Sequence, residues 1–199
     1  MKVLIACEYS GTVRDAFAKL GHDAWSCDIL PTDAPGQHYQ CDVIEVLDNG
    51  WDLMIAHPPC TDLAVSGAAW FKEKIADGRQ QRALDFVSTL MNADIECIAI
   101  ENPISVISSK IRKPTQIVQP WMFGHTETKA TCLWLKGLPK LIPTNNVKKE
   151  TLSLPENKRM RLHYLPPSPN RWKLRSKTFQ GIADAMAQQW GDDRLEFRK

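Results

Sequence analysis

The chain lacks any hydrophobic run long enough to cross a membrane, and we expect no N-terminal leader. A transmembrane helix needs roughly 18 or more consecutive apolar residues, and no run in these 199 residues approaches that length. Met1 and Lys2 lead at once into a short aliphatic run, without the small-residue cleavage site that ends a signal peptide. We therefore expect a cytoplasmic protein with no membrane partner.

The sequence also lacks paired cysteines, because its six cysteines include no CxxC motif and no cluster with histidine. Their spacing argues against a disulfide framework and against a zinc site, so we expect reduced thiols and no bound metal. Internal repeats and low-complexity tracts are absent too. The whole chain contains 43% hydrophobic and 24% charged residues. This composition is typical of a globular protein with a single main domain.

The net charge is only +2, but the charge is distributed unevenly. Residues 136–177 hold eleven lysines and arginines against two glutamates, a net +9 that leaves −7 for the rest of the chain. Such a basic segment suggests a surface that faces a polyanion, and a solvated loop with unpaired lysines is the alternative.

Apolar runs and amphipathic segments alternate along the chain. The apolar runs predict strands at 2–7, 23–27, 52–56, 95–100 and 131–135. Apolar residues at a spacing of three and four predict helices at 13–20, 79–92 and 179–190. This alternation predicts an α/β fold with a mostly parallel central sheet and helices on both faces.

Three segments follow from this pattern. They are an α/β core over 1–135, a reduced basic recognition or loop segment over 136–177, and a C-terminal helix over 178–199 that returns to the core. Most aromatic side chains pack in cores, and we expect this of three tryptophans: Trp70, Trp121 and Trp134.

The first strand leads into a short turn, Glu8-Tyr9-Ser10-Gly11-Thr12, and then into a helix. Strand, small-residue turn and helix open many nucleotide-binding α/β folds, in which the amides at the helix N-terminus face a ligand. Asp28 ends the second strand, where an acid is placed to accept hydrogen bonds from ribose hydroxyls; a turn or helix-capping aspartate is the alternative. Asp42 follows a short polar segment and is a further place to hold an adenine or its amine.

The apolar run 53–56 stops abruptly at Pro58-Pro59, because proline cannot donate the hydrogen bonds of a strand ladder. Cys60 then lies on the loop beyond the carboxyl end of the strand, where open α/β sheets bind ligands. An ordinary turn with a small buried cysteine is the alternative. Glu101-Asn102-Pro103 ends the next predicted strand in the same way. Because strands joined by a crossover are commonly neighbours, we expect Cys60 and Glu101 at the same edge of the sheet.

In the order of these features the chain resembles the cytosine-5 DNA methyltransferases over nearly its whole length. The Pro-Pro-Cys loop with Ser66-Gly67 behind it, together with the Glu101-Asn102 pair, is the specific part of the resemblance. The glycine turn and the two aspartates are weaker support. The small size fits a compact member of the phage or mobile-element type.

The sequence departs from the family pattern at several places. Val13 stands where the family has a second glycine, His57 where it has a small residue, and Thr61 where a glutamine follows the cysteine. No arginine lies in 125–129, where the family's arginine-rich motif should fall, and Lys129 is the nearest cationic substitute. The recognition region is reduced to the short basic segment.

The resemblance implies a Rossmann-like, S-adenosylmethionine-dependent methyltransferase fold and methyl transfer to carbon 5 of cytosine in DNA, single- or double-stranded, with RNA as an open alternative. In the family's chemistry the thiolate of Cys60 adds to carbon 6 of the base, and Glu101 contacts ring nitrogen 3, a role that favours a raised pKa of its carboxyl group. Asn102 would brace the loop. The implied cofactor-binding residues are Tyr9, Ser10, Gly11, Thr12, Asp28, Asp42 and Pro58. The implied substrate-binding residues are Ser66, Asn102, Lys129, Arg159, Arg161 and Arg171.

Two other functions remain open. An amino methyltransferase would carry an acid or amide before Pro-Pro and an aromatic residue after it, whereas His57 and Cys60 occupy those flanking places. A non-catalytic nucleic-acid-binding or decoy protein that kept the fold would explain the missing glycine, the absent arginine motif and the short recognition region.

Overall fold

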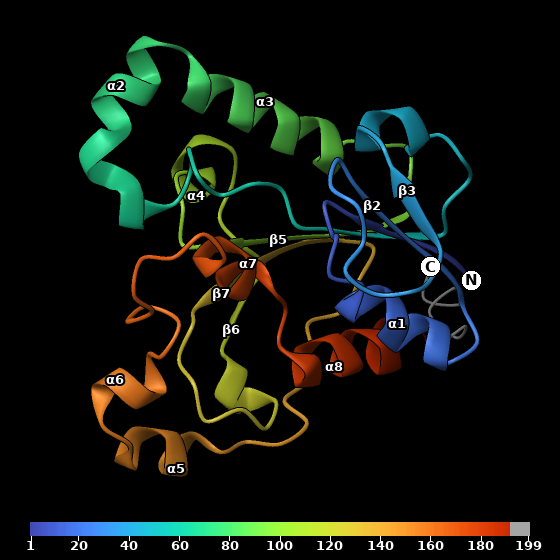
Figure 1. Cartoon of the computed structure of the whole chain (residues 1–199). Helices are drawn as coiled ribbons and strands as arrows, with labels where there is room; N and C mark the ends of the chain where they lie inside the picture. The colour runs from blue at the N-terminus through green and yellow to red at the C-terminus, as the bar shows by residue number, and fades with distance from the viewer. Residues whose placement is uncertain (192–199) are drawn as a thin grey trace.

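A seven-stranded sheet forms the centre of the molecule in the computed structural model, which describes residues 1–191 (Figure 1). The strands are ordered β3-β2-β1-β4-β5-β7-β6, and only β7 runs opposite to the others. Their bounds are Lys2–Ala6 for β1, Asp23–Asp28 for β2, His38–Gln40 for β3, Leu53–Ala56 for β4, Cys97–Pro103 for β5, Gln116–Val118 for β6 and Thr131–Lys136 for β7. This sheet confirms the predicted fold class, an α/β fold with a mostly parallel central sheet.

Helices cover both faces of the sheet. α1 and α8 pack together on one face, and α3 lies on the opposite face (Figure 1). The α-helices are Thr12–Lys19 (α1), Phe71–Ala76 (α2), Arg79–Met91 (α3), Ile107–Lys110 (α4), Lys148–Ser153 (α5), Glu156–Arg159 (α6), Arg171–Ser176 (α7) and Gln180–Trp190 (α8). Three 3₁₀ helices span Val43–Val46 (η1), Val65–Trp70 (η2) and Pro120–Met122 (η3). Within residues 1–191, no helix is long and apolar enough to cross a membrane.

β4 explains why the sheet is covered on both sides. All four of its residues are buried, and they alternate between the two faces because side chains of a strand point in opposite directions. Leu53 and Ile55 join the core cluster under α1 and α8, whereas Met54 and Ala56 join the cluster under α3. A continuous apolar run of this kind is typical of a central parallel strand.

β5 is longer than predicted. It continues through Glu101, Asn102 and Pro103, because these residues pair with the antiparallel strand β7. Pro103 is the last residue of the strand, so its missing N–H interrupts no further pairing. The predicted strand bounds of 95–100 are therefore wrong, whereas Glu101 lies at the carboxyl end of β5 as predicted.

Beyond Lys136, which ends β7, the basic segment 136–177 forms loops and three short helices, α5, α6 and α7, outside the sheet (Figure 1). Trp134 is fully buried as predicted and Trp121 is partly buried, but Trp70 is 64% exposed. The prediction for Trp70 is wrong because this residue ends η2, a helix with no buried residue. Of the predicted C-terminal segment, residues 192–199 lie outside the described residues.

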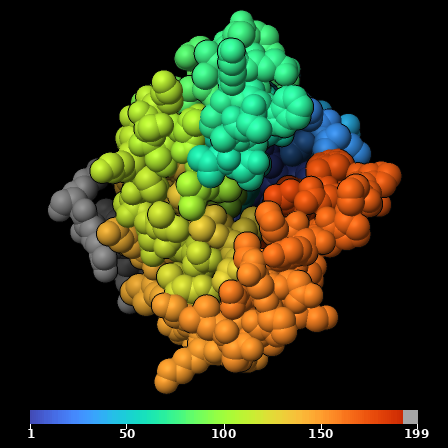
Figure 2. Space-filling view, turned by 90° about the vertical axis from the view of Figure 1, so that its left-hand side faces the viewer, coloured from blue at the N-terminus to red at the C-terminus, as the bar shows by residue number. Residues whose placement is uncertain are grey.

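One face of the molecule is hollowed (Figure 2). The walls come from the teal segment around η2 and α2 and from the orange residues of the basic segment, and the dark-blue N-terminal residues lie at the bottom (Figure 2). Segments distant in the sequence therefore meet at this hollow.

Phe17, in α1, is fully buried in the cluster shared with α8. Phe17→Ala is expected to lower the free energy of unfolding by about 3–5 kcal/mol, because it removes buried apolar surface and leaves a cavity. Leu20 follows the same helix and is 49% exposed, so Leu20→Ala should change the free energy by no more than about 0.5 kcal/mol. Urea denaturation followed by circular dichroism measures both, and equal losses would contradict this core assignment.

Candidate active site

The loop after β4 places Cys60 at the carboxyl edge of the sheet. The backbone N–H of His57 donates to the carbonyl of Ala6 at 2.9 Å, so pairing with β1 continues one residue beyond the strand. Behind the two prolines, the amides of Leu63 and Ala64 both donate to the carbonyl of Cys60, at 3.0 and 2.9 Å. This closed turn fixes the backbone of Cys60, whose side chain is partly buried.

Two buried polar side chains from α2 and α3 hold the same loop from behind. Lys74 donates to the carbonyl of Thr61 and lies 3.3 Å from the carboxylate of Asp62. Gln80 donates to the carbonyl of Asp62 at 3.3 Å. Sequence reasoning missed both residues, because lysine and glutamine are seldom buried and these two stand among exposed charged residues.

β5 contacts the loop through Asn102, which is buried. Its amide nitrogen donates to the carbonyl of Pro58 at 2.9 Å, so Asn102 braces the loop as expected. Ala64 and Ser105 form an antiparallel bridge that ties the loop to the segment after β5. Ser66 lies just beyond, exposed in η2.

The parallel register of β4 and β5 makes His57 and Glu101 neighbours. Ala56 pairs with Ile100, so the next residue of each strand lies at the same level. Nδ1 of His57 lies 3.1 Å from Oε2 of Glu101, and both side chains are largely buried. Sequence reasoning had noted His57 only as a departure from the family pattern; the paired strand ends were the signal that could have found it.

The pair shifts both pKa values. Burial disfavours the protonated imidazole, but the hydrogen bond and charge of Glu101 outweigh it and raise the pKa of His57 above its ordinary value. Burial also disfavours the ionised carboxyl group, yet His57 and Lys129 hold the pKa of Glu101 below its ordinary value. The expectation of a raised pKa for Glu101 is therefore wrong, and His57 is the main reason.

Two cations act on the thiol of Cys60. Burial and the charge of Glu101 raise the pKa of this thiol above its ordinary value, while Lys129 and Arg175 oppose the shift. Lys129 precedes β7, and its Nζ donates to the carbonyl of Arg175 in α7 at 2.8 Å. The structure thus brings Cys60, Glu101 and Lys129 together, three residues that the sequence analysis singled out at separate points of the chain.

The two aspartates predicted to bind cofactor lie beside the end of β1. Cys7 follows β1 with a left-handed φ of 59°, which is uncommon for a residue with a side chain. Burial and the charges of Asp28 and Asp42 raise the pKa of its thiol. Asp28 accepts from the amide of Leu30 at 2.9 Å, and Asp42 caps η1 by accepting from Ile44 at 3.1 Å. A carboxylate accepts several hydrogen bonds, so these local contacts are compatible with a ligand role.

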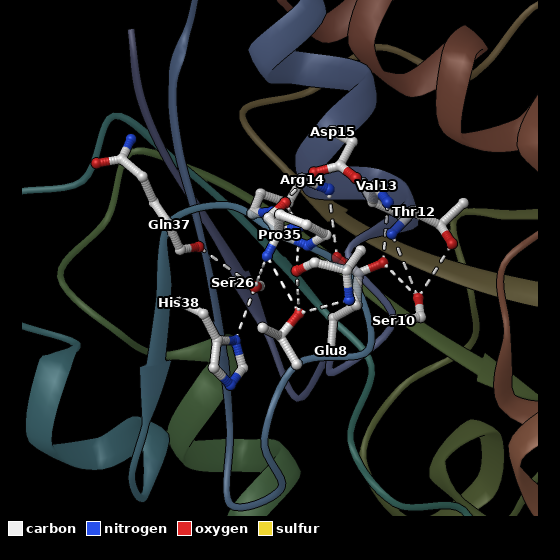
Figure 3. A network of polar contacts seen from close by, with 12 residues as sticks. Glu8, Ser10, Thr12, Val13, Arg14, Asp15, Ser26, Pro35, Gln37 and His38 are labelled. Carbon is white, nitrogen blue, oxygen red and sulfur yellow. Dashed lines mark hydrogen bonds and ion pairs between the residues drawn. The ribbon is translucent and has the colours of Figure 1, made fainter.

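The carboxylate of Glu8 caps the start of α1 (Figure 3). It accepts from the amides of Val13 at 2.8 Å and Arg14 at 3.2 Å, and from the hydroxyl of Ser10 at 3.0 Å. Ser10 in turn accepts from the amide of Thr12 at 3.3 Å. We expected the amides at this helix start to face a ligand. That expectation is wrong for Val13 and Arg14, because a buried acid of the chain itself already neutralises the positive end of the helix.

The guanidinium group of Arg14 is almost fully buried and holds the loop after β2 (Figure 3). It donates to the carbonyls of Ala34 and Pro35, at 3.2 and 2.9 Å. Gly11 has a φ of 72° and Gly36 a φ of 147°, and a Cβ at Gly36 would lie 2.6 Å from the guanidinium carbon. The two glycines therefore make room for Arg14.

α7 covers Tyr9. The hydroxyl of Tyr9 lies 3.1 Å from that of Ser176, and its ring centroid lies 5.6 Å from that of Trp172. Nζ of Lys173 lies 5.4 Å from the centre of the Tyr9 ring. The basic segment is thereby joined to the turn that was predicted to bind cofactor.

The three predicted substrate arginines lie in the basic segment, away from the loop of Cys60 in sequence. Arg161 is exposed and pairs with Glu127 at 2.9 Å, Arg171 donates to the carbonyl of Leu165 at 2.8 Å, and Arg159 is partly buried. Two of the three guanidinium groups therefore make contacts within the protein.

No protein-family model matches the sequence, and no curated protein sequence matches it either. Among solved structures, the chain is similar to a candidate DNA modification methyltransferase encoded within an E. coli prophage, with 17% sequence identity and a TM-score of 0.45. The similarity covers 77% of this chain and 55% of that one, so this chain spans about half the length of its structural neighbour. The function is therefore inferred from the geometry of the site.

Lys74→Met removes the buried ammonium group behind the loop of Cys60. We expect it to lower the free energy of unfolding by about 1–3 kcal/mol, because the carbonyl of Thr61 and the carboxylate of Asp62 lose their partner. Hydrogen exchange at the amides of Leu63 and Ala64 should accelerate. Lys72 is exposed on the same helix, and Lys72→Met should change neither quantity. Unchanged exchange in Lys74→Met would contradict the bracing role.

Proposed function

We propose that this protein transfers a methyl group from S-adenosylmethionine to carbon 5 of cytosine in DNA. The observation that carries the proposal is the placement of Cys60 and Glu101 at the carboxyl ends of adjacent parallel strands. Lys129 and Arg175 add positive charge beside the thiol. A nucleophile, a carboxyl group and nearby cations at one sheet edge suit nucleophilic attack on a heteroaromatic base.

Cys60 is the proposed nucleophile. Carbon 5 of cytosine is a poor nucleophile until a thiolate adds to carbon 6 and turns the ring into an enamine-like species. Only the thiolate attacks, and burial disfavours it here, so Lys129 and Arg175 have the task of stabilising the ionised form. Binding of a base would bring carbon 6 within reach of Cys60. The loop that carries Cys60 is already fixed by its backbone contacts.

Glu101 is the proposed partner of ring nitrogen 3. A carboxyl group that donates a hydrogen bond or proton there stabilises the charge that develops when the thiolate adds. Asn102 holds the loop through Pro58 and so keeps the nucleophile and the carboxyl group at a constant separation.

The residues around the end of β1 fit S-adenosylmethionine by their chemistry. Asp28 and Asp42 offer carboxylate oxygens for ribose hydroxyls and an adenine amine, and the strained backbone of Cys7 is typical of a turn shaped around a ligand. Tyr9, Ser10, Gly11, Thr12 and Pro58 complete the proposed set. When bound, this cofactor supplies an electrophilic methyl group.

DNA is the proposed substrate because a basic wall borders the hollow (Figure 2). A cytosine inside a duplex is out of reach, so the base must be flipped or presented on a single strand. Lys129 and Ser66 would lie near the base, with Arg159, Arg161 and Arg171 towards the phosphates. Asn102 remains in the proposed substrate set as well.

A second candidate function is nucleic-acid binding without catalysis. The Glu8 carboxylate on the start of α1 and the cover of α7 over Tyr9 favour it, since the chain fills contacts that a cofactor could use. Titration calorimetry with S-adenosylmethionine separates the two candidates. Saturable binding supports the methyltransferase, and no heat of binding supports the second candidate.

The nucleophile is tested by trapping with 5-fluorocytosine DNA and S-adenosylmethionine. Fluorine prevents release of the adduct, so the protein should become covalently attached and shift in a denaturing gel. Cys60→Ala should give no adduct. Cys97 is a partly buried thiol at the amino end of β5, and Cys97→Ala should keep the adduct. Absence of an adduct in the native protein on single-stranded, double-stranded and RNA substrates would reject the proposal.

The phosphate contacts are tested by salt dependence. Lys158, in the last turn of α6, is exposed, and Lys158→Ala should weaken DNA binding for all sequences and reduce the slope of log K against log salt by about 1. Lys19 ends α1 and is exposed outside the basic segment. Lys19→Ala should leave the slope unchanged, and an equal effect of the two substitutions would argue against an interface on the basic segment.

A further inference from the structure

His57 and Glu101 form a buried hydrogen-bonded pair at the edge of the sheet. The 3.1 Å distance between Nδ1 and Oε2 requires a proton between the two atoms, since an ionised carboxylate only accepts. The side chains are 10% and 16% exposed. The backbone N–H of His57 donates to the carbonyl of Ala6, which fixes the main chain that carries the imidazole.

Nε2 of His57 is buried and has no hydrogen-bond partner among residues 1–191. A buried polar atom without a partner costs about 1–3 kcal/mol, so a histidine kept only for packing is usually satisfied at both nitrogens. His38 is such a residue, with Nδ1 at 2.8 Å from Ser26 and Nε2 at 3.0 Å from Leu30. The contrast indicates that His57 occupies this position for its contact with Glu101 rather than for structural stability.

Several charged groups face the pair. Glu8, which follows β1, and Lys129, which precedes β7, act on His57 with opposite signs. Glu101 faces Lys129 and accepts a hydrogen bond from Thr131. The charge of Glu101 also raises the pKa of Cys60, which lies on the same loop as His57.

We propose that His57 is a positioning residue that stores the proton which Glu101 delivers to ring nitrogen 3 of the substrate base. The proposal rests on the methyltransferase function above and assigns to His57 a role that no other described contact explains. Free Glu101 is a carboxylate and repels the lone pair of nitrogen 3. The pair as a whole still holds one proton that can be placed on either partner.

The proton transfer balances within the pair. As the base binds, the Nδ1–H bond of His57 breaks and an O–H bond forms on Glu101, leaving a neutral imidazole and a neutral carboxylic acid. Rotation of the carboxyl group presents the O–H to nitrogen 3, and the proton moves there as the thiolate of Cys60 adds to carbon 6. Once carbon 5 carries the methyl group, a water molecule takes the remaining proton from carbon 5. The double bond between carbons 5 and 6 then forms again as the bond between carbon 6 and the sulfur of Cys60 breaks. The proton on nitrogen 3 returns to Glu101 and then to His57.

The pKa directions agree with this arrangement. The pKa of His57 is raised and that of Glu101 is lowered, so the proton rests on His57 in the free protein. Ionisation of Cys60, whose pKa is also raised, increases methyl transfer with pH equally in all variants. Relative to that increase, methyl transfer should fall as the pH rises through the raised pKa of His57, because the pair then loses its proton. In His57→Asn the carboxyl group of Glu101 must supply its own proton, so the falling limb should move to lower pH.

The test compares single-turnover methyl transfer from pH 6 to 9 in the native protein, in His57→Asn and in His22→Asn. His22 precedes β2 at the opposite edge of the sheet. We expect His57→Asn to be slower by about 10²-fold at pH 8 and to recover towards pH 6, while His22→Asn follows the native profile. Loss by the same factor at every pH would overturn the proposal and leave a structural role for His57.

Nuclear magnetic resonance supplies a readout that does not need activity. The ¹⁵N shifts of His57 should report a pKa above the ordinary value in the native protein and a lower one in Glu101→Gln. Equal titration of His57 in both proteins would overturn the proposal even if His57→Asn fails to fold. If the native protein forms no fluorocytosine adduct, the methyltransferase function fails instead, whereas a native adduct with an unchanged pH profile in His57→Asn rejects only the proton store.

Discussion

Parallel pairing of β4 with β1 on one side and β5 on the other is the constraint on which the rest of the site depends. Ala56 pairs with both Ala6 and Ile100, so the last residues of β1 and β4 lie level with the point where β5 goes on to pair with β7 alone. The residues with proposed chemical roles on or after β4 and β5, His57, Cys60 and Glu101, follow within a few residues of these pairs. Because the strands are buried on both faces, a slip of register would move apolar side chains out of both cores. The free energy that such a slip would cost keeps the register, and with it the positions of the site residues, fixed.

Charge taken out of water at this edge has to be matched by the chain itself. Glu8 is matched by amides of α1, Arg14 by carbonyls after β2, and Lys74 by the loop of Cys60. Within residues 1–191, the buried side-chain atoms left unmatched are Nε2 of His57, Oδ1 of Asn102 and Oγ of Ser105. All three lie on or directly after β4 and β5, so unsatisfied polarity is confined to the place where chemistry is proposed.

The fold and part of the site could be predicted from the sequence because they depend on local patterns. Apolar runs give strands, and proline after a run marks where β4 ends, so the neighbourhood of Cys60 and Glu101 was foreseeable. The contacts of Glu8, Arg14 and Lys74 were not, because each joins residues whose approach depends on the assembled sheet. Val13 illustrates the limit, because only the structure shows that its side chain turns into the core.

Arg14 and the glycines at 11 and 36 form one interlocked unit. The guanidinium group occupies the volume that a Cβ would need at either glycine, and the loop carrying Gly36 is held by the same group through Ala34 and Pro35. The effects of substitutions at the three positions are therefore coupled. A shorter residue at position 14 would open this volume and release the loop between β2 and β3, but the positive φ of Gly11 and Gly36 would still favour glycine at both positions.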